Sequence, residues 1–184
     1  MAAVVVLVGV TMIGLAAIAT PAAATEAFED EAVRFRYPVE WIAAPGVGGA
    51  DGHRVVAHLV TFGVETDQLC ISFADPCTLE PKDIPAGEAS VVITAWEGGT
   101  PPVPDPVINR PAGLDADAII GGRPAAFDRR GIDQGATVLW WQLSPPGFPD
   151  RWIEVTAVLR GVVLEETGVF ADIEELLNSV EFRE

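Results

Sequence analysis

A β-hairpin is predicted by ATVLWWQL at residues 136–143 and RWIEVTAVL at residues 151–159, joined by SPPGFPD at residues 144–150. Apolar side chains alternate along both arms, as in strands that bury one face. The joining residues are rich in proline and other turn formers, which end strands. These two segments therefore form the clearest β-hairpin that the sequence predicts.

One face of the hairpin carries a candidate ligand-binding surface. We expect a register in which Trp140 lies opposite Glu154 and Gln142 lies opposite Trp152. Tryptophans beside a glutamate and a glutamine are typical of a surface that binds a ligand or a partner. The alternative is that a helix covers this face, as in sheets that are buried on both sides. Burial of both tryptophans under the C-terminal helix would favour that alternative.

The segment after the hairpin has helical periodicity. Phe170, Ile173, Leu176 and Leu177 recur at the spacing of one helix face, and acidic residues occupy the other face. This pattern predicts an amphipathic helix at the C-terminus. The rest of the chain has strand-like alternation between turn-forming stretches. Further strands are expected at residues 32–37, 53–62, 89–97, 116–120 and 124–130.

The chain begins with an uncharged, strongly apolar stretch, since residues 1–25 carry no charged side chain. The small residues Ala22 and Ala24 are typical of a signal-peptidase site. We therefore expect a signal peptide at residues 1–24 and one globular domain at residues 25–184. No basic residue precedes the apolar run, so an uncleaved membrane anchor is the alternative. Both interpretations place the domain outside the cytoplasm, secreted or in the cell envelope.

The charge balance excludes some partners. The sequence has 11 basic and 27 acidic residues, which gives a net charge of −16. Such an acidic protein lacks the basic surface that nucleic acids require, so we expect no nucleic-acid partner. Lys82 is the only lysine, and the frequent alanine, glycine and proline suggest a GC-rich prokaryotic genome. The acidity also fits salt adaptation, because net charge keeps a protein soluble.

Two cysteines, Cys70 and Cys77, are the only ones in the sequence. A close pair in an oxidising compartment favours a disulfide. A redox pair and half of a metal site are the alternatives. The spacing is not Cys-x-x-Cys, and neither histidine is adjacent in sequence, so both alternatives have less support.

No sequence motif points to catalysis. The chain lacks the nucleophile-elbow, zinc-protease, phosphate-loop and dinucleotide-binding patterns. His53 and His58 are five residues apart on an expected strand, so they should face opposite sides and share no metal unless the strand has a bulge. We expect no catalytic residue, no metal and no cofactor.

The segment Phe35-Arg36-Tyr37-Pro38-Val39-Glu40-Trp41 resembles the N-terminal signature of the PsbP-like superfamily. Residues 121–125 and 173–182 resemble the middle turn and the closing helix and strand of that superfamily. The resemblance implies an α+β fold, an α/β/α sandwich around an antiparallel sheet with a C-terminal helix. Members include extrinsic photosystem II subunits, a nuclear-import factor that binds a small GTPase, and secreted bacterial proteins of unknown role. They share no catalytic residues, so the resemblance assigns none here.

Three functional hypotheses follow from these features. The first is a non-enzymatic interaction or accessory module outside the cytoplasm, with an unknown protein partner and membrane contact only through an uncleaved N-terminal segment. The second is a small-ligand-binding protein that uses Trp140, Gln142, Trp152 and Glu154. An uncharacterised enzyme is the least favoured.

Overall fold

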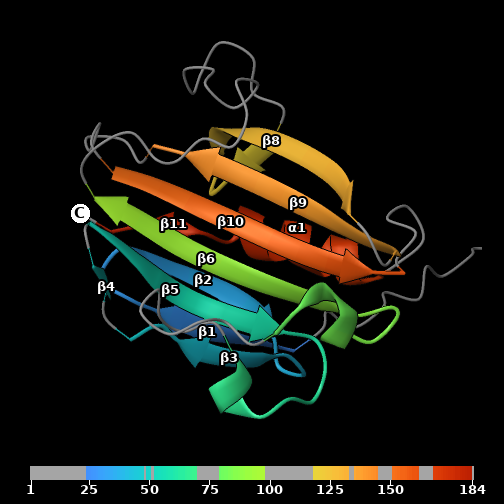
Figure 1. Cartoon of the computed structure of the whole chain (residues 1–184). Coiled ribbons are helices and arrows are strands. Elements are labelled where there is room, and N and C mark those ends of the chain that lie inside the picture. Colours follow the sequence, from blue (N-terminus) through green and yellow to red (C-terminus); the bar gives the residue numbers. More distant parts are fainter. Residues whose placement is uncertain are drawn as a thin grey trace, which may run out of the picture.

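Antiparallel pairing builds a large twisted sheet across the molecule (Figure 1). Its strand order is β3-β5-β6-β10-β9-β8-β7, and β4 pairs with β5 outside this path. The computed structural model describes residues 24–47, 49–50, 52–69, 79–97, 118–132, 135–144, 151–161 and 168–183. The large sheet contains β3 (Ile42–Pro45), β4 (Gly49–Ala50), β5 (His53–Val60), β6 (Ala89–Glu97), β7 (Ala118–Ile120), β8 (Arg123–Ile132), β9 (Ala136–Leu143) and β10 (Arg151–Arg160).

A second, three-stranded sheet has the order β1-β2-β11. In β2 the odd-numbered residues are buried and the arginines between them are exposed, as a half-buried strand requires. Phe28 stacks on Phe35 across β1 and β2, with ring centroids 4.9 Å apart. The elements outside the large sheet are β1 (Thr25–Glu29), β2 (Val33–Pro38), the 3₁₀ turns η1 (Thr66–Gln68) and η2 (Pro81–Asp83), helix α1 (Gly168–Asn178) and β11 (Glu181–Phe182).

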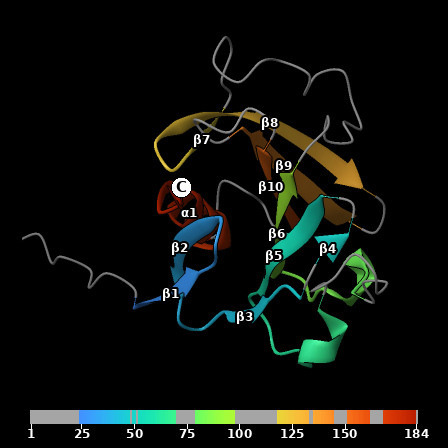
Figure 2. The ribbon, with the colours of Figure 1, turned by 90° about the vertical axis from the view of Figure 1, so that its left-hand side faces the viewer.

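The core lies between the large sheet and a layer made of α1 and the three-stranded sheet (Figure 2). Helix α1 contributes Ile173, Leu176 and Leu177, which are buried in one cluster with side chains of the strands. We call the sheet face that meets this layer the inner face. Its side chains include Leu59, Val91, Ile93, Leu139, Trp141, Ile153 and Val155.

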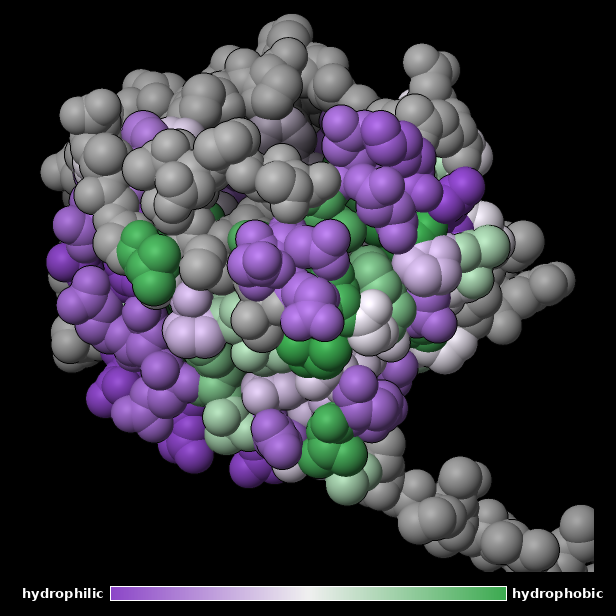
Figure 3. Space-filling view, turned by 60° about the horizontal axis from the view of Figure 1, so that its bottom comes forward, coloured by the Kyte–Doolittle hydropathy of each residue, from purple (hydrophilic) through white to green (hydrophobic). Residues whose placement is uncertain are grey.

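The opposite face of the large sheet, the outer face, is apolar at one end. There Ala44, Val60 and Leu69 form a second buried cluster beneath residues of the segments around η1. On the lower end of the molecule, which carries β3 and η1, hydrophobic residues form small patches among hydrophilic ones (Figure 3). Toward β9 and β10 the outer face carries alternating polar and aromatic side chains instead.

The predicted α/β/α sandwich is wrong. The described residues contain one α-helix, and α1 covers the inner face only. The rest of that layer is the β1-β2-β11 sheet, so most of the described structure is antiparallel sheet. The physical reason lies in the short, strongly alternating segment at residues 33–38, which buries one stripe of side chains and extends the layer as a strand.

Several sequence-based predictions fall outside the described residues. They concern the proposed disulfide between Cys70 and Cys77 and the signal peptide up to Ala22. Ala24, the last residue of the proposed signal peptide, is the first described residue and is exposed. Among the described residues, none of the helices has the length and apolar character needed to cross a membrane.

Candidate functional site

Glu154 lies at the centre of the candidate site on the outer face. Strand β10 runs between β6 and β9, and Glu154 pairs with Thr94 on one side and Gln142 on the other. Directly paired residues in an antiparallel sheet point to the same face, and diagonal neighbours are still within reach of large side chains. The tryptophans at these neighbouring positions complete the group. We call this group the Glu154 cluster: Thr94, Trp96, Trp140, Gln142, Trp152 and Glu154.

The register differs from the predicted one by two residues. Glu154 lies opposite Gln142, where the sequence predicted Trp140. Trp152 lies opposite Trp96 of β6, where the sequence predicted Gln142. A two-residue shift leaves every side chain on its face, because side chains alternate with a period of two. The four predicted residues therefore still share one face, but their partners change.

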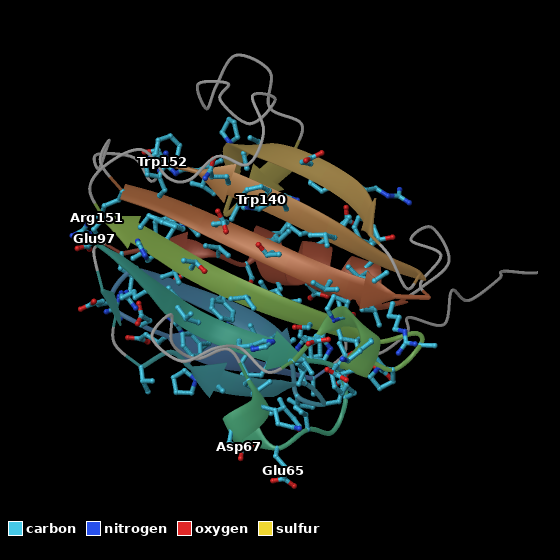
Figure 4. All side chains as sticks on the ribbon, viewed as in Figure 1. Glu65, Asp67, Glu97, Trp140, Arg151 and Trp152 are labelled. Carbon is cyan, nitrogen blue, oxygen red and sulfur yellow. The ribbon has the colours of Figure 1, made fainter. Side chains whose placement is uncertain are left out.

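Helix α1 does not cover this face. It packs against the inner face, which carries Trp141 and Ile153, whereas the side chains of Trp140 and Trp152 project from the other face (Figure 4). Both of these tryptophans are half-buried. The expected alternative, burial of the two tryptophans beneath the C-terminal helix, is therefore wrong.

Two hydrogen-bond donors in the cluster have no partner in the described part of the chain. They are the side-chain Nε2 of Gln142 and the indole Nε1 of Trp140, and both atoms are buried. Gln142 is only 4% exposed. A buried donor without a partner costs about 1–3 kcal/mol. Native structures contain few such groups, and a bound ligand or an ordered water often accepts their hydrogen bond.

The carboxyl group of Glu154 is about half protonated near pH 7. Burial raises its pKa from 4.5 to about 7, and the nearby Trp140 indole N–H lowers it to a smaller extent. The Trp140 N–H thus acts on this carboxyl group, although its Nε1 atom meets no acceptor with standard hydrogen-bond geometry in the described part of the chain. Glu154 can therefore donate a proton to a ligand oxygen below pH 7 and accept a hydrogen bond above it.

An aromatic row continues the cluster toward the edge of the sheet. The His53 ring contacts the Trp96 ring, with centroids 4.4 Å apart and a 43° angle between the planes. At this end of the sheet Arg151 lies 3.4 Å from Glu97 and forms an ion pair (Figure 4). A polar hollow of about 190 Å³ opens beside the row and is lined by Glu31, Gly52, His53, Arg54 and Glu97.

The sequence predicted that His53 and His58 lie on opposite faces of the sheet, unless the strand has a bulge. The structure places both on the same face. The pairing of β5 with β6 shifts between Val55 and Ala57, where a β-bulge inserts one extra residue. As a result His53 pairs with Trp96 and His58 pairs with Val92, and both histidines lie on the outer face. The described residues contain no group of three histidine, cysteine, aspartate or glutamate side chains that could hold a metal ion.

His58 is part of the packed interior. It is 0% exposed, and its Nε2 lies 2.7 Å from the Ser90 hydroxyl. Burial lowers its pKa from 6.5 to about 4, because the charged ring would lose its hydration. His58 is therefore neutral at physiological pH and has a structural role beside the candidate site.

The sequence analysis missed Thr94 and Trp96. Their signal is the alternation Ser90, Val92, Thr94 and Trp96 along one face of β6, which mixes polar and aromatic side chains. The pairing of β6 with β10 joins strands that are far apart in the sequence. Alternation alone does not reveal such a pairing, so these residues could not be assigned to the Glu154 cluster.

Comparison with known proteins adds no identity. No family model matches the sequence, and no curated protein matches it at a significant level.

Proposed function

We propose that this protein is a non-enzymatic binding module that acts outside the cytoplasm and uses the Glu154 cluster to hold a small, uncharged ligand. The observation that carries the proposal is the buried Gln142 amide, whose Nε2 has no partner in the described part of the chain. The uncharged apolar stretch at residues 1–25 supports an extracytoplasmic location.

The chemistry of the cluster favours a ligand rich in hydroxyl or amide groups. The donors of Gln142 and Trp140 require acceptor oxygens, and Glu154 exchanges one proton near neutral pH. The half-buried indole rings supply flat apolar surfaces, on which the C–H face of a sugar ring can pack. A sugar combines these features in one molecule, with adjacent hydroxyl groups and an apolar ring face.

The burial of the polar groups favours a small ligand over a flat protein partner. Gln142 is almost completely buried, and Glu154 is half-buried between neighbouring strands. A ligand that reaches these groups would have to displace the half-buried rings of Trp140 and Trp152, which a small molecule does more easily than a flat protein surface.

Calorimetric titration of the full chain with a panel of monosaccharides, disaccharides and small neutral amides tests the proposal. The Gln142→Leu variant removes the unpartnered donor at similar side-chain volume. We expect this variant to lose ligand binding and to become more stable by about 1 kcal/mol. Failure of the whole panel to bind the wild-type protein would contradict the proposal. Unchanged affinity in the variant would show that the ligand lies elsewhere.

A further inference from the structure

A second hollow lies away from the Glu154 cluster, between α1 and the β7–β8 edge of the large sheet. Its volume is about 240 Å³. Trp141 and Leu177, which are 3% and 2% exposed, form its floor. This volume lies a little below the roughly 300 Å³ at which typical ligand pockets begin, so it suits a small organic ligand.

Aromatic rings form the walls of this hollow. The Phe127 and Trp141 rings contact each other, with centroids 5.2 Å apart and a 35° angle between the planes. Phe170 of α1 also lines the hollow and is half-buried. The faces of aromatic rings carry partial negative charge and attract cations as well as apolar groups.

The rim of the hollow is negative. Glu174 and Asn178 line it from α1, and no lysine or arginine lines it among the described residues. Glu174 is exposed and forms no ion pair with another described residue. It lies in the last turns of α1, where the helix dipole places partial negative charge. The net charge of −16 attracts cations to the whole protein.

The β7–β8 turn holds the two sides of the hollow at a fixed separation, and it lies beside α1 in Figure 2. The Gly121 N–H donates a hydrogen bond to the Leu177 carbonyl at 2.9 Å. Gly121 has a φ of 55°, and a Cβ at this position would overlap the Val180 carbonyl oxygen. Ile119, on the adjacent strand, is 57% exposed at the rim. The hollow is therefore preformed, which lowers the entropic cost of binding.

We propose that this hollow binds a small organic ammonium ion with an aromatic or apolar body. The body packs against Phe127, Phe170 and Trp141, and the ammonium group lies at the rim beside Glu174. The proposal is independent of the ligand of the Glu154 cluster, because the two sites lie on different faces of the large sheet.

Calorimetric titration of the full chain tests this site with three ligands of similar shape. They are 2-phenylethylamine, which is a cation at pH 7, neutral 2-phenylethanol and anionic 3-phenylpropanoate. We expect the cation to bind about tenfold more tightly than the neutral compound, and the anion to bind least. Equal affinity of all three compounds, or no binding of the cation, would overturn the proposal.

Two adjacent carboxylates provide a matched pair of variants. Glu174 lines the hollow, whereas Glu175 is its neighbour on α1, is also exposed and lines a different groove. We expect Glu174→Gln to weaken binding of 2-phenylethylamine about fivefold and Glu175→Gln to leave it nearly unchanged. If both variants weaken binding equally, only the net charge of the protein attracts the cation, and the assignment of Glu174 is overturned.

The Gln142→Leu variant distinguishes this site from the Glu154 cluster. It should bind 2-phenylethylamine like the wild-type protein, because Gln142 projects from the opposite face of the sheet. If this variant loses the ammonium ion, the ion binds at the Glu154 cluster and the proposed location is wrong. NMR shift changes at α1 and β7 in the wild-type protein would support the location directly.

Discussion

Glu154 and Gln142 lie directly opposite each other across the β9–β10 pair, and the Gln142 Nε2 atom has no hydrogen-bond partner in the described part of the chain. A carboxyl group that is about half protonated near pH 7 and an unpartnered amide are costly to bury, but both can hydrogen-bond a polar ligand. This relationship is the basis of the proposed function, and it also has consequences for stability.

Replacement of Glu154 by glutamine should change how stability depends on pH. The folded-state pKa is about 7 and the reference value is 4.5, so the folded protein holds this proton while the unfolded chain releases it. The wild type therefore loses stability as pH rises from about 4.5 to about 7, by an amount of about 3 kcal/mol. Glu154→Gln should therefore exceed the wild type by much less at pH 4.5 than at pH 8. Urea unfolding at both pH values measures this difference, and a constant difference between the two proteins would contradict it.

His58 should affect the pH dependence of stability in the opposite direction, because its contribution is lost as the pH falls. Its folded-state pKa is about 4, below the reference value of 6.5, so the unfolded chain binds the proton first as pH falls. The contribution of His58 is complete above about pH 6.5 and is lost toward pH 4, with a slope of up to about 1.4 kcal/mol per pH unit. Glutamine at this position keeps a polar group beside Ser90 without titrating. The free energy of unfolding of His58→Gln should therefore fall less steeply with acid, and an unchanged slope would refute this.

Arg54 joins the smaller sheet to the large one. Its guanidinium donates hydrogen bonds to both Asp30 carboxylate oxygens, at 2.8 and 2.6 Å. Burial raises the pKa of Asp30, but the hydrogen bonds from Arg54 and from the Ala32 N–H outweigh it and leave that pKa below its usual value. Arg54→Lys keeps the charge but loses the planar fork, and should cost about 1–2 kcal/mol.

The control for this variant is Arg34→Lys. Arg34 is exposed and lies 3.9 Å from Glu181, so this variant should change stability by less than about 0.5 kcal/mol. Thermal unfolding measures both variants. If both variants lose the same amount of stability, the two hydrogen bonds from Arg54 to Asp30 do not contribute to stability.

The β7–β8 turn offers a pair of adjacent glycines with different surroundings. Both have positive φ, 55° for Gly121 and 73° for Gly122, so alanine strains the backbone at either position. A Cβ at Gly121 would also overlap the Val180 carbonyl oxygen, whereas a Cβ at Gly122 meets nothing within 4 Å. Gly122→Ala should cost about 1 kcal/mol and Gly121→Ala distinctly more. Chemical unfolding measures the stability of both variants. Equal losses of stability would show that close contact between Gly121 and the Val180 carbonyl does not matter.

The sequence predicted local elements well where periodicity was strong. The β9–β10 hairpin and α1 follow directly from alternation and from helical spacing. Strand β1 was missed because TEAFE at residues 25–29 alternates weakly and is mostly exposed. The hairpin register was wrong because a longer loop leaves it free to shift by two residues without changing faces.

The candidate site could be predicted only in part. Trp140, Gln142, Trp152 and Glu154 share a face because of local alternation, which the sequence contains. Thr94 and Trp96 join them through the pairing of β6 with β10, which depends on the packing of the whole sheet. The unpartnered donors likewise depend on the arrangement of three strands, and no single segment encodes them.

NMR of the full chain during titration with a sugar that binds in calorimetry tests the central claim most directly. The side-chain amide signal of Gln142 and the indole signal of Trp140 report on the two unpartnered donors. We predict that both signals shift together and saturate at the calorimetric affinity, while the indole signal of Trp141, on the inner face, stays in place. Shifts confined to other parts of the chain, with both donor signals unchanged, would contradict binding at the Glu154 cluster.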